Sequence, residues 1–316
     1  MRVALFLLSL AALAVGGYLA IASWFLANTA ANILTAGPLA TALAQAEQPA
    51  DPLVIGYRGT PMDGLGLAFQ IVPIETPLGP ADAWLVPAAG AEKGRAIYVH
   101  GIAGTRENGF RQLSILHEAG WTVLMIAYRN HDTAPPAPDG RYGVGLTEWP
   151  DLEAAVAYLA PDAGGPGLLV AADSMGAAIL GQFLAQSTLA DRVAAIALDS
   201  PAISFAAVTD ALARVNGYPL AGPTALIAGF ILPLTTGLPL NDAEVAAVFQ
   251  AFPGPVFIAH GTADKIVPIA PSQALANARS APTATLWTDA DHLGSYAADP
   301  AAYRAAFVAF LATLGR

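Results

Sequence analysis

The stretch Leu168-Leu169-Val170-Ala171-Ala172-Asp173-Ser174-Met175-Gly176-Ala177-Ala178 places a serine at the junction of two different patterns. The residues before Ser174 form an apolar run typical of a buried strand, and those after it begin a helix. A tight strand-to-helix turn pushes a hydroxyl out above the edge of a sheet. The stretch therefore predicts that Ser174 is a nucleophile, although a serine in this position can also be a simple helix N-cap.

Short apolar segments alternate with helical patterns through the rest of the chain. An opening antiparallel pair of strands is expected, followed by buried strands that are separated by helices. Parallel strands with both faces covered are continuous apolar runs of this kind, so we expect an α/β fold with a mostly parallel central sheet and helices on both faces. The expected strands are residues 67–75, 83–86, 96–99, 123–128, 168–172, 194–198, 256–259 and 283–287.

Residues 201–253 are too many for a simple connection between two strands. Helical patterns at 205–215, 224–232 and 242–252 predict a small helical cap over the C-terminal edge of the sheet. The run 225–232 is strongly apolar. It is interpreted either as a helix packed on the body, or as the wall of an acyl pocket or a membrane-facing lid. It is too short to cross a membrane.

Residues 3–27 carry no charge and are long enough to span a bilayer as a helix. Arg2 precedes them and the next basic residue is Arg58, so the positive-inside rule predicts that the following domain is extracytoplasmic. A cleaved signal peptide with an Ala-Leu-Ala site at 42–44 is an alternative, as is a buried helix, although the apolar run is long for a signal peptide. We therefore expect a transmembrane anchor, a stalk and linker, and a folded domain at residues 1–27, 28–52 and 53–316.

The composition excludes several classes of function. The chain has 316 residues, no cysteine and a net charge of −10. Without cysteine there can be no disulfide, thiolate nucleophile or cysteine-based metal site. Phosphate binding needs clustered Lys and Arg, so no nucleic-acid partner is expected. The five histidines are scattered without the spacing of metal ligands, so we expect neither a metal nor another cofactor.

A serine nucleophile needs a base, and the base needs an acid that orients it. His292 follows the last expected strand, and among the histidines it alone follows a candidate acid at the end of a strand. That acid is Asp264, in the loop after an earlier strand; it can also cap a turn or pair with Lys265. Asp289 and Asp291 are alternative acids, but they lie close to His292 in the sequence.

The oxyanion of an acyl-transfer intermediate needs backbone N–H donors. The loop His100-Gly101-Ile102-Ala103-Gly104 follows a short strand, and its small residues let the backbone approach a reacting carbonyl. We expect Met175 N–H, directly after the nucleophile, to be one donor and Ile102 N–H to be the second, with Ala103 as the alternative to Ile102. His100 is expected to brace this loop. Met175, Tyr128 and Trp149 either line an acyl site or belong to the core.

Residues 95–314 resemble the α/β-hydrolase superfamily, in particular bacterial esterases and lysophospholipase-like serine hydrolases. The resemblance is carried by His-Gly-Ile-Ala-Gly at 100–104, the turn at 172–176, Gly-Thr-Ala-Asp at 261–264 and Asp-His at 291–292. The chain order of serine, aspartate and histidine is the one expected of this fold. One departure is Ala172, where the family turn carries a glycine.

The resemblance implies a serine hydrolase that cleaves carboxylic esters, with Ser174, His292 and Asp264 as its catalytic triad. The expected partners are a small-molecule or lipid ester substrate and, through the N-terminal helix, a membrane. A peptidase or amidase with the same triad is an alternative. A binding protein that has the fold without the chemistry is another.

Overall fold

One sheet organises the part of the chain that the computed structural model describes, residues 1–131, 133–160 and 167–314. Its eight strands have the order β1-β2-β4-β3-β5-β6-β7-β8. β2 is antiparallel to both β1 and β4, and all other neighbours are parallel, so the predicted mostly parallel sheet is confirmed. The strands are β1 (Gln70–Thr76), β2 (Gly79–Val86), β3 (Gly94–Val99), β4 (Trp121–Met125), β5 (Leu168–Asp173), β6 (Val193–Asp199), β7 (Val256–Gly261) and β8 (Thr283–Thr288).

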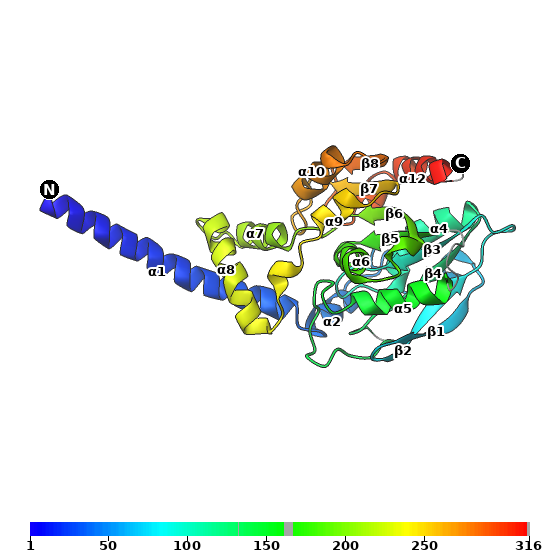
Figure 1. The fold of residues 1–316 in the computed structure, drawn as a ribbon, viewed down its shortest axis with the longest axis horizontal. Coiled ribbons are helices and arrows are strands. Elements are labelled where there is room, and N and C mark those ends of the chain that lie inside the picture. Colours follow the sequence, from blue (N-terminus) through cyan, green and yellow to red (C-terminus); the bar gives the residue numbers. More distant parts are fainter. Residues whose placement is uncertain (132, 161–166, 315–316) are drawn as a thin grey trace.

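Helices cover both faces of this sheet (Figure 1). Because side chains alternate along a strand, Val170 and Ala172 of β5 belong to one hydrophobic core, whereas Leu169 and Ala171 belong to the other. α5 (Trp149–Leu159) and α6 (Met175–Gln186) contribute to the first core, and α4 (Phe110–Glu118) and α12 (Pro300–Leu314) to the second. The remaining short helices of the body are α2 (Pro38–Ala44), α3 (Pro61–Leu65), η1 (Arg106–Gly109), η2 (Ala190–Arg192), α10 (Ala270–Ala278) and α11 (Ser295–Ala298).

In the chain, a group of helices follows β6 and precedes β7, within the segment for which a cap is expected (Figure 1). It consists of α7 (Phe205–Val215), α8 (Ala221–Thr236), η3 (Leu240–Asp242) and α9 (Ala246–Ala251). α8 is longer than the apolar run suggested, because the helix continues through Pro233 to a left-handed Gly237. Ala225, Ala228 and Leu232 of α8 are buried in the core that also contains α6.

The N-terminal helix α1 (Arg2–Ile33) is long and apolar enough to cross a membrane, with a mean hydropathy of 2.2 over its most apolar window, and none of that window is buried. The last turns of α1, unlike this exposed window, pack into the body. Leu26, Ala27, Ala30 and Ala31 are buried in the core. The helix thus continues beyond the expected anchor. The start of the expected stalk is packed against the body instead of standing free.

Candidate active site

Ser174 lies at the turn between β5 and α6 with φ 49° and ψ −118°. A positive φ in a residue with a Cβ costs on the order of 1–3 kcal/mol and persists only where the surroundings enforce it. Here the Ser174 N–H donates to Asp199 O at 3.0 Å, and the Ala202 N–H donates to Ser174 O at 3.0 Å. Backbone bonds to the end of β6 and the segment after it therefore hold the strained turn in place.

Small residues let the turn approach the neighbouring strand. A Cβ on Gly176 would lie 2.4 Å from Val99 O, closer than any side-chain atom can approach. A Cβ on Gly101 would lie 3.0 Å from Ser174 Cβ, so the loop after β3 passes directly beside the serine. Ala172, the departure from the family pattern, is fully buried in the core, and its methyl group fits there.

Ser174 and Asp264 each lie within hydrogen-bonding distance of His292, although the three residues follow three different strands. His292 Nε2 is 3.0 Å from Ser174 Oγ, and His292 Nδ1 is 2.7 Å from Asp264 Oδ2. A carboxylate only accepts, so it selects the tautomer with a proton on Nδ1 and leaves Nε2 to accept the serine hydroxyl. The structure thus brings together the three side chains that the sequence assigns to the triad.

Asp264 is held as an anion by its surroundings. Burial raises the pKa of this carboxyl, but hydrogen bonds from His260 and His292 and from the Val267 N–H outweigh burial and hold the pKa below its ordinary value. Asp264 Oδ1 accepts the backbone N–H groups of Ile266 and Val267, each at 2.9 Å. Asp264 therefore remains charged at neutral pH, as a group that orients an imidazole must.

His260 is a second histidine at this carboxylate, and sequence reasoning missed its role. Its Nε2 lies 2.9 Å from Val267 O and 3.3 Å from Asp264 Oδ2, and its Nδ1 lies 2.8 Å from Ser272 Oγ. The ring is fully buried at the end of β7 and fixes the loop that carries the acid. The only available signal was its position four residues before Asp264.

The alternative acids take other positions. Asp289 and Asp291 are exposed. Asp291 Oδ1 accepts the backbone N–H of His292 at 2.8 Å and that of Lys265 at 3.3 Å, so it links two loops, whereas Nδ1 of the imidazole ring contacts Asp264.

Tyr128 supports the loop His100–Gly104 from the core side. Tyr128 donates its hydroxyl to the carbonyls of His100 and Gly101 at 2.9 and 3.0 Å, and the rings of Tyr128 and His100 stack with centroids 4.3 Å apart. Burial lowers the pKa of His100 well below its ordinary value, so this ring is neutral. Tyr128 is fully buried, so it supports the loop from within the core.

The two expected oxyanion donors belong to the turn that carries Ser174 and to the loop that passes beside it. Ile102 follows Gly101, on which a Cβ would lie 3.0 Å from Ser174 Cβ, and Ile102 is half-buried. Met175 is the first residue of α6, and the first N–H groups of a helix have no partner within the helix. Ala103, the alternative donor, has φ 51°, which marks a sharp turn in this loop. The Met175 side chain is a member of the core.

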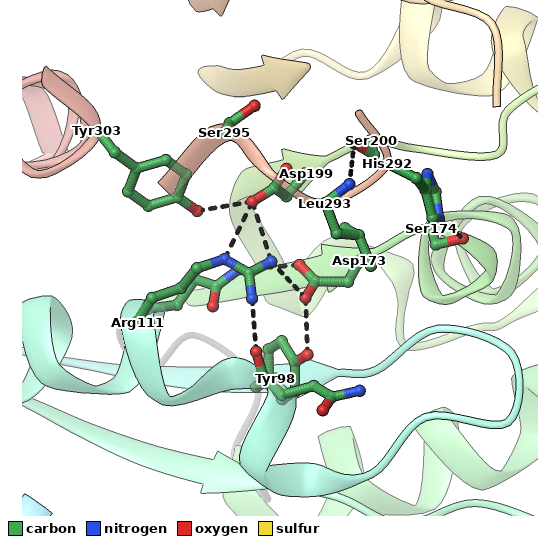
Figure 2. Close-up of polar contacts among 12 residues, drawn as sticks. Tyr98, Arg111, Asp173, Ser174, Asp199, Ser200, His292, Leu293, Ser295 and Tyr303 are labelled. Carbon is green, nitrogen blue, oxygen red and sulfur yellow. Dashed lines mark hydrogen bonds and ion pairs between the residues drawn. The ribbon is translucent and has the colours of Figure 1, made fainter. Parts of the chain in front are cut away.

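A buried cluster of charges lies behind the serine, and sequence reasoning did not identify it (Figure 2). Arg111 of α4 donates to Asp173 at 2.7 Å and to Asp199 at 3.0 Å, and neither the guanidinium nor the carboxylates reach solvent. Tyr98 donates to Asp173 at 2.8 Å, and Tyr303 donates to Asp199 at 3.0 Å. The cluster ties α4 and α12 to the ends of β5 and β6.

Each carboxylate of this cluster is followed in the chain by a serine with a strained, positive φ. Asp173 stands directly before Ser174, and Asp199 stands before Ser200, which has φ 44°. Ser200 Oγ accepts the Leu293 N–H at 3.0 Å, so Ser200 holds the loop that carries His292 (Figure 2). Arg111 therefore anchors the two strand ends from which both the serine and the histidine loop are positioned.

Comparisons with known proteins agree with this architecture. No protein-family model matches the chain. YfhR of Salmonella typhimurium, an uncharacterised protein, is 27% identical over 246 residues, which are 73% of this chain and 76% of that protein. The esterase Pf2001 of Pyrococcus furiosus aligns with a TM-score of 0.61 and 20% identity over 84% of this chain and 99% of its own.

Two further solved structures are similar. An esterase of Thermogutta terrifontis has a TM-score of 0.57 and 17% identity, over 78% of this chain and 100% of its own. The esterase RhEst1 of a Rhodococcus species has a TM-score of 0.53 and 17% identity, over 77% of this chain and 99% of its own. The sheet and these likenesses together show that the chain has the α/β-hydrolase fold, as its sequence resemblance predicted.

Proposed function

We propose that this protein is a serine hydrolase that cleaves carboxylic esters through an acyl-enzyme. The observation that carries the proposal is the unbroken hydrogen-bond path from Ser174 Oγ through His292 to Asp264, with contacts of 3.0 and 2.7 Å. An alcohol is a poor nucleophile at neutral pH, and this arrangement supplies both the base and the anion that orients it.

In the proposed reaction, Ser174 Oγ attacks the ester carbonyl while His292 Nε2 takes its proton. The Ile102 and Met175 N–H groups stabilise the oxyanion that forms. As the tetrahedral intermediate collapses, the C–O bond to the alcohol breaks and His292 returns the proton to the departing alcohol. Water, deprotonated by His292, then attacks the acyl-enzyme; the bond from the acyl carbon to Ser174 Oγ breaks, His292 returns the proton to Oγ, and the acid leaves. Asp264 stabilises the imidazolium in both halves of the reaction.

Ester substrates are favoured by the names of the structural neighbours from Pyrococcus, Thermogutta and Rhodococcus, all of which are esterases. A peptidase would use the same three side chains, and no feature of the described residues favours it over an esterase. We assign the substrate to small-molecule or lipid esters.

We also propose that α1 anchors the catalytic domain on the extracytoplasmic side of a membrane. Arg2 and the absence of further basic residues before Arg58 support this orientation. Retention of the helix is supported by burial: cleavage at the Ala-Leu-Ala site 42–44 would remove Leu26 and Ala27, which are completely buried in the core. The mass of the membrane-bound protein tests this, because a cleaved chain would lack its first residues.

Hydrolysis of p-nitrophenyl esters from acetate to palmitate by the detergent-solubilised full chain tests the activity. Ser174→Ala should lower kcat by roughly 10⁴–10⁶-fold, because it removes the nucleophile. The chain length with the highest kcat/KM would show the size of the acyl site. A folded wild-type protein that hydrolyses none of these esters, or a Ser174→Ala variant with full turnover, would refute the proposal.

A further inference from the structure

The cap helix α8 carries an exposed apolar stripe. Leu226, Phe230 and Leu234 are 66%, 66% and 86% exposed, and their spacing of four residues places them on one face of the helix. The opposite face, which includes Ala225, Ala228 and Leu232, is buried. No residue from Ala221 to Thr236 carries a charge. We call Leu226, Phe230 and Leu234 the cap stripe.

Direct contacts fix α8 against α1. Ser23 Oγ donates to Thr224 O at 3.0 Å, in a buried contact, and the Tyr18 hydroxyl donates to Pro219 O just before α8. Figure 1 shows α8 crossing α1 where the long helix meets the body. The cap helix therefore occupies a fixed level along α1, beside Ser23.

That level corresponds to the edge of a bilayer. A hydrocarbon core of about 30 Å takes up about 20 helical residues at 1.5 Å each. Counted from Val3, the first residue of the uncharged run, the core ends close to Ser23. Trp24 and Phe25, which are 53% and 60% exposed, lie at the same level, where aromatic side chains are favoured.

We propose that the cap stripe is a membrane-binding surface that inserts among lipid acyl chains at the boundary of the outer leaflet. The inference rests on the proposed anchoring by α1. The occupant is lipid, because α8 is fixed beside the point where α1 leaves the hydrocarbon, and its exposed stripe is as apolar and uncharged as the exposed surface of α1. An interfacial helix of this kind buries its apolar face to a depth of about 5–10 Å. The cap would then be fixed to both the body and the bilayer.

The absence of cysteine makes the test direct, because a single introduced cysteine can be labelled in the full chain. Leu226→Cys, Phe230→Cys and Leu234→Cys are each labelled with an environment-sensitive nitrobenzoxadiazole dye and reconstituted into phosphatidylcholine vesicles. Quenching by phosphatidylcholine that carries a nitroxide on its acyl chain then reports contact with lipid, and aqueous iodide reports exposure to water. Ester hydrolysis by the same samples shows that each variant is folded.

Two further cysteine positions serve as controls for contact with lipid. Leu10→Cys in the exposed part of α1 is the positive control. Val308→Cys is the matched negative control, because Val308 is also an exposed apolar residue on a helix, at 44%, but lies on α12 at the far end of the body from α1 (Figure 1). We expect at least twofold stronger nitroxide quenching at the cap stripe than at Val308, together with weaker iodide quenching.

The outcomes separate the possible failures. Quenching by nitroxide at Leu10 but not at the cap stripe would overturn the membrane-binding surface and leave the anchor intact. Shielding of the cap stripe from both quenchers would mean that a second protein copy covers it, which also overturns the proposal. A lack of nitroxide quenching at Leu10 would overturn the anchor and the cap surface together, while ester hydrolysis would still be measured independently.

Discussion

Arg111 Nη2 lies 2.7 Å from Asp173 Oδ2 in the interior of the protein, one residue from the proposed nucleophile. The guanidinium comes from α4 and the carboxylate from the end of β5, and both are shielded from water. Burial lowers the pKa of Arg111, but Asp173 and Asp199 outweigh this effect and hold it well above its ordinary value, so the guanidinium stays charged. The strained turn at Ser174 therefore rests on a buried ion cluster instead of on apolar packing alone.

Removal of the Arg111 guanidinium should lower the free energy of unfolding. Arg111→Met leaves two buried carboxylates without their cation, and loss of one partner from a buried pair typically costs about 3–5 kcal/mol. The free energy of unfolding, measured by denaturant titration of the full chain in detergent, should fall by that amount. Arg304→Met is the matched control, because its pair with Glu118 is about half exposed and such pairs contribute about 0–1 kcal/mol. Equal losses in the two variants would show that the buried cluster has no special role.

The raised pKa of Asp173 should make the stability of the protein depend on pH. Burial raises the pKa of this carboxyl from 3.8 to about 6, against the opposing effect of Arg111. The pKa of Asp173 is thus higher in the folded protein than in the unfolded chain. Between these two pKa values, Asp173 is therefore protonated to a greater extent in the folded protein. The stability that the raised pKa of Asp173 contributes is fully present below pH 3.8 and is lost as the pH rises through about 6.

Asp173→Asn, which mimics the neutral acid, should lack this change. Relative to Asp173→Asn, the wild type should lose up to about 3 kcal/mol between pH 4 and pH 7, as expected for a shift of about two pKa units. Parallel denaturant titrations of both proteins over this range provide the measurement. A difference between them that stays constant with pH would contradict the raised pKa.

Asp264 and Asp291 can be separated by matched substitutions. Asp264→Asn removes the anion that we propose orients and stabilises the His292 imidazolium, and loss of such a charge typically lowers kcat by about 10⁴-fold. Asp291→Asn keeps the oxygen that accepts the backbone N–H of His292, so it should change kcat by less than about threefold. Steady-state hydrolysis of one p-nitrophenyl ester measures both. A larger effect at Asp291 would move the acid to that position.

Gly176 should tolerate no side chain. The Cβ of Gly176→Ala would meet Val99 O at 2.4 Å, so α6 or β3 must shift, at a typical cost of about 1–3 kcal/mol, and the serine moves with the turn. We expect kcat/KM to fall at least about tenfold, the equivalent of 1.4 kcal/mol.

Gly229→Ala in α8 is the matched control. Its Cβ would come no nearer than 3.7 Å to another atom, so activity should be retained and helix stability should rise by up to about 1 kcal/mol. Equal activity in the two alanine variants would contradict a tightly packed turn at Ser174.

The sequence was most informative where function depends on local patterns at strand ends. The apolar run before Ser174 and the loops after β7 and β8 are short, contiguous signals, so the sheet and the three triad candidates could be predicted from them. Their catalytic roles stay predictions until activity is measured, whereas the mostly parallel sheet is confirmed by the fold.

The buried cluster could not be predicted in this way, because its partners are distant in sequence. Arg111 is separated from Asp173 by 62 positions and from Asp199 by 88. In the sequence, Arg111 looks like an ordinary charge on a surface helix. The packing of Leu26 and Ala27 into the body was likewise hidden, since a segment that spans a membrane and one that packs in a core have the same composition. Long-range packing decides both features.

The assignment of Ser174 as the nucleophile is tested most directly by mass spectrometry of the full chain after reaction with a fluorophosphonate, which reacts covalently with activated serines. We expect one adduct per chain, located on Ser174, that is abolished in Ser174→Ala and strongly slowed in His292→Ala. A folded wild-type protein that gains no adduct, or that gains it on another serine, would contradict the proposed nucleophile.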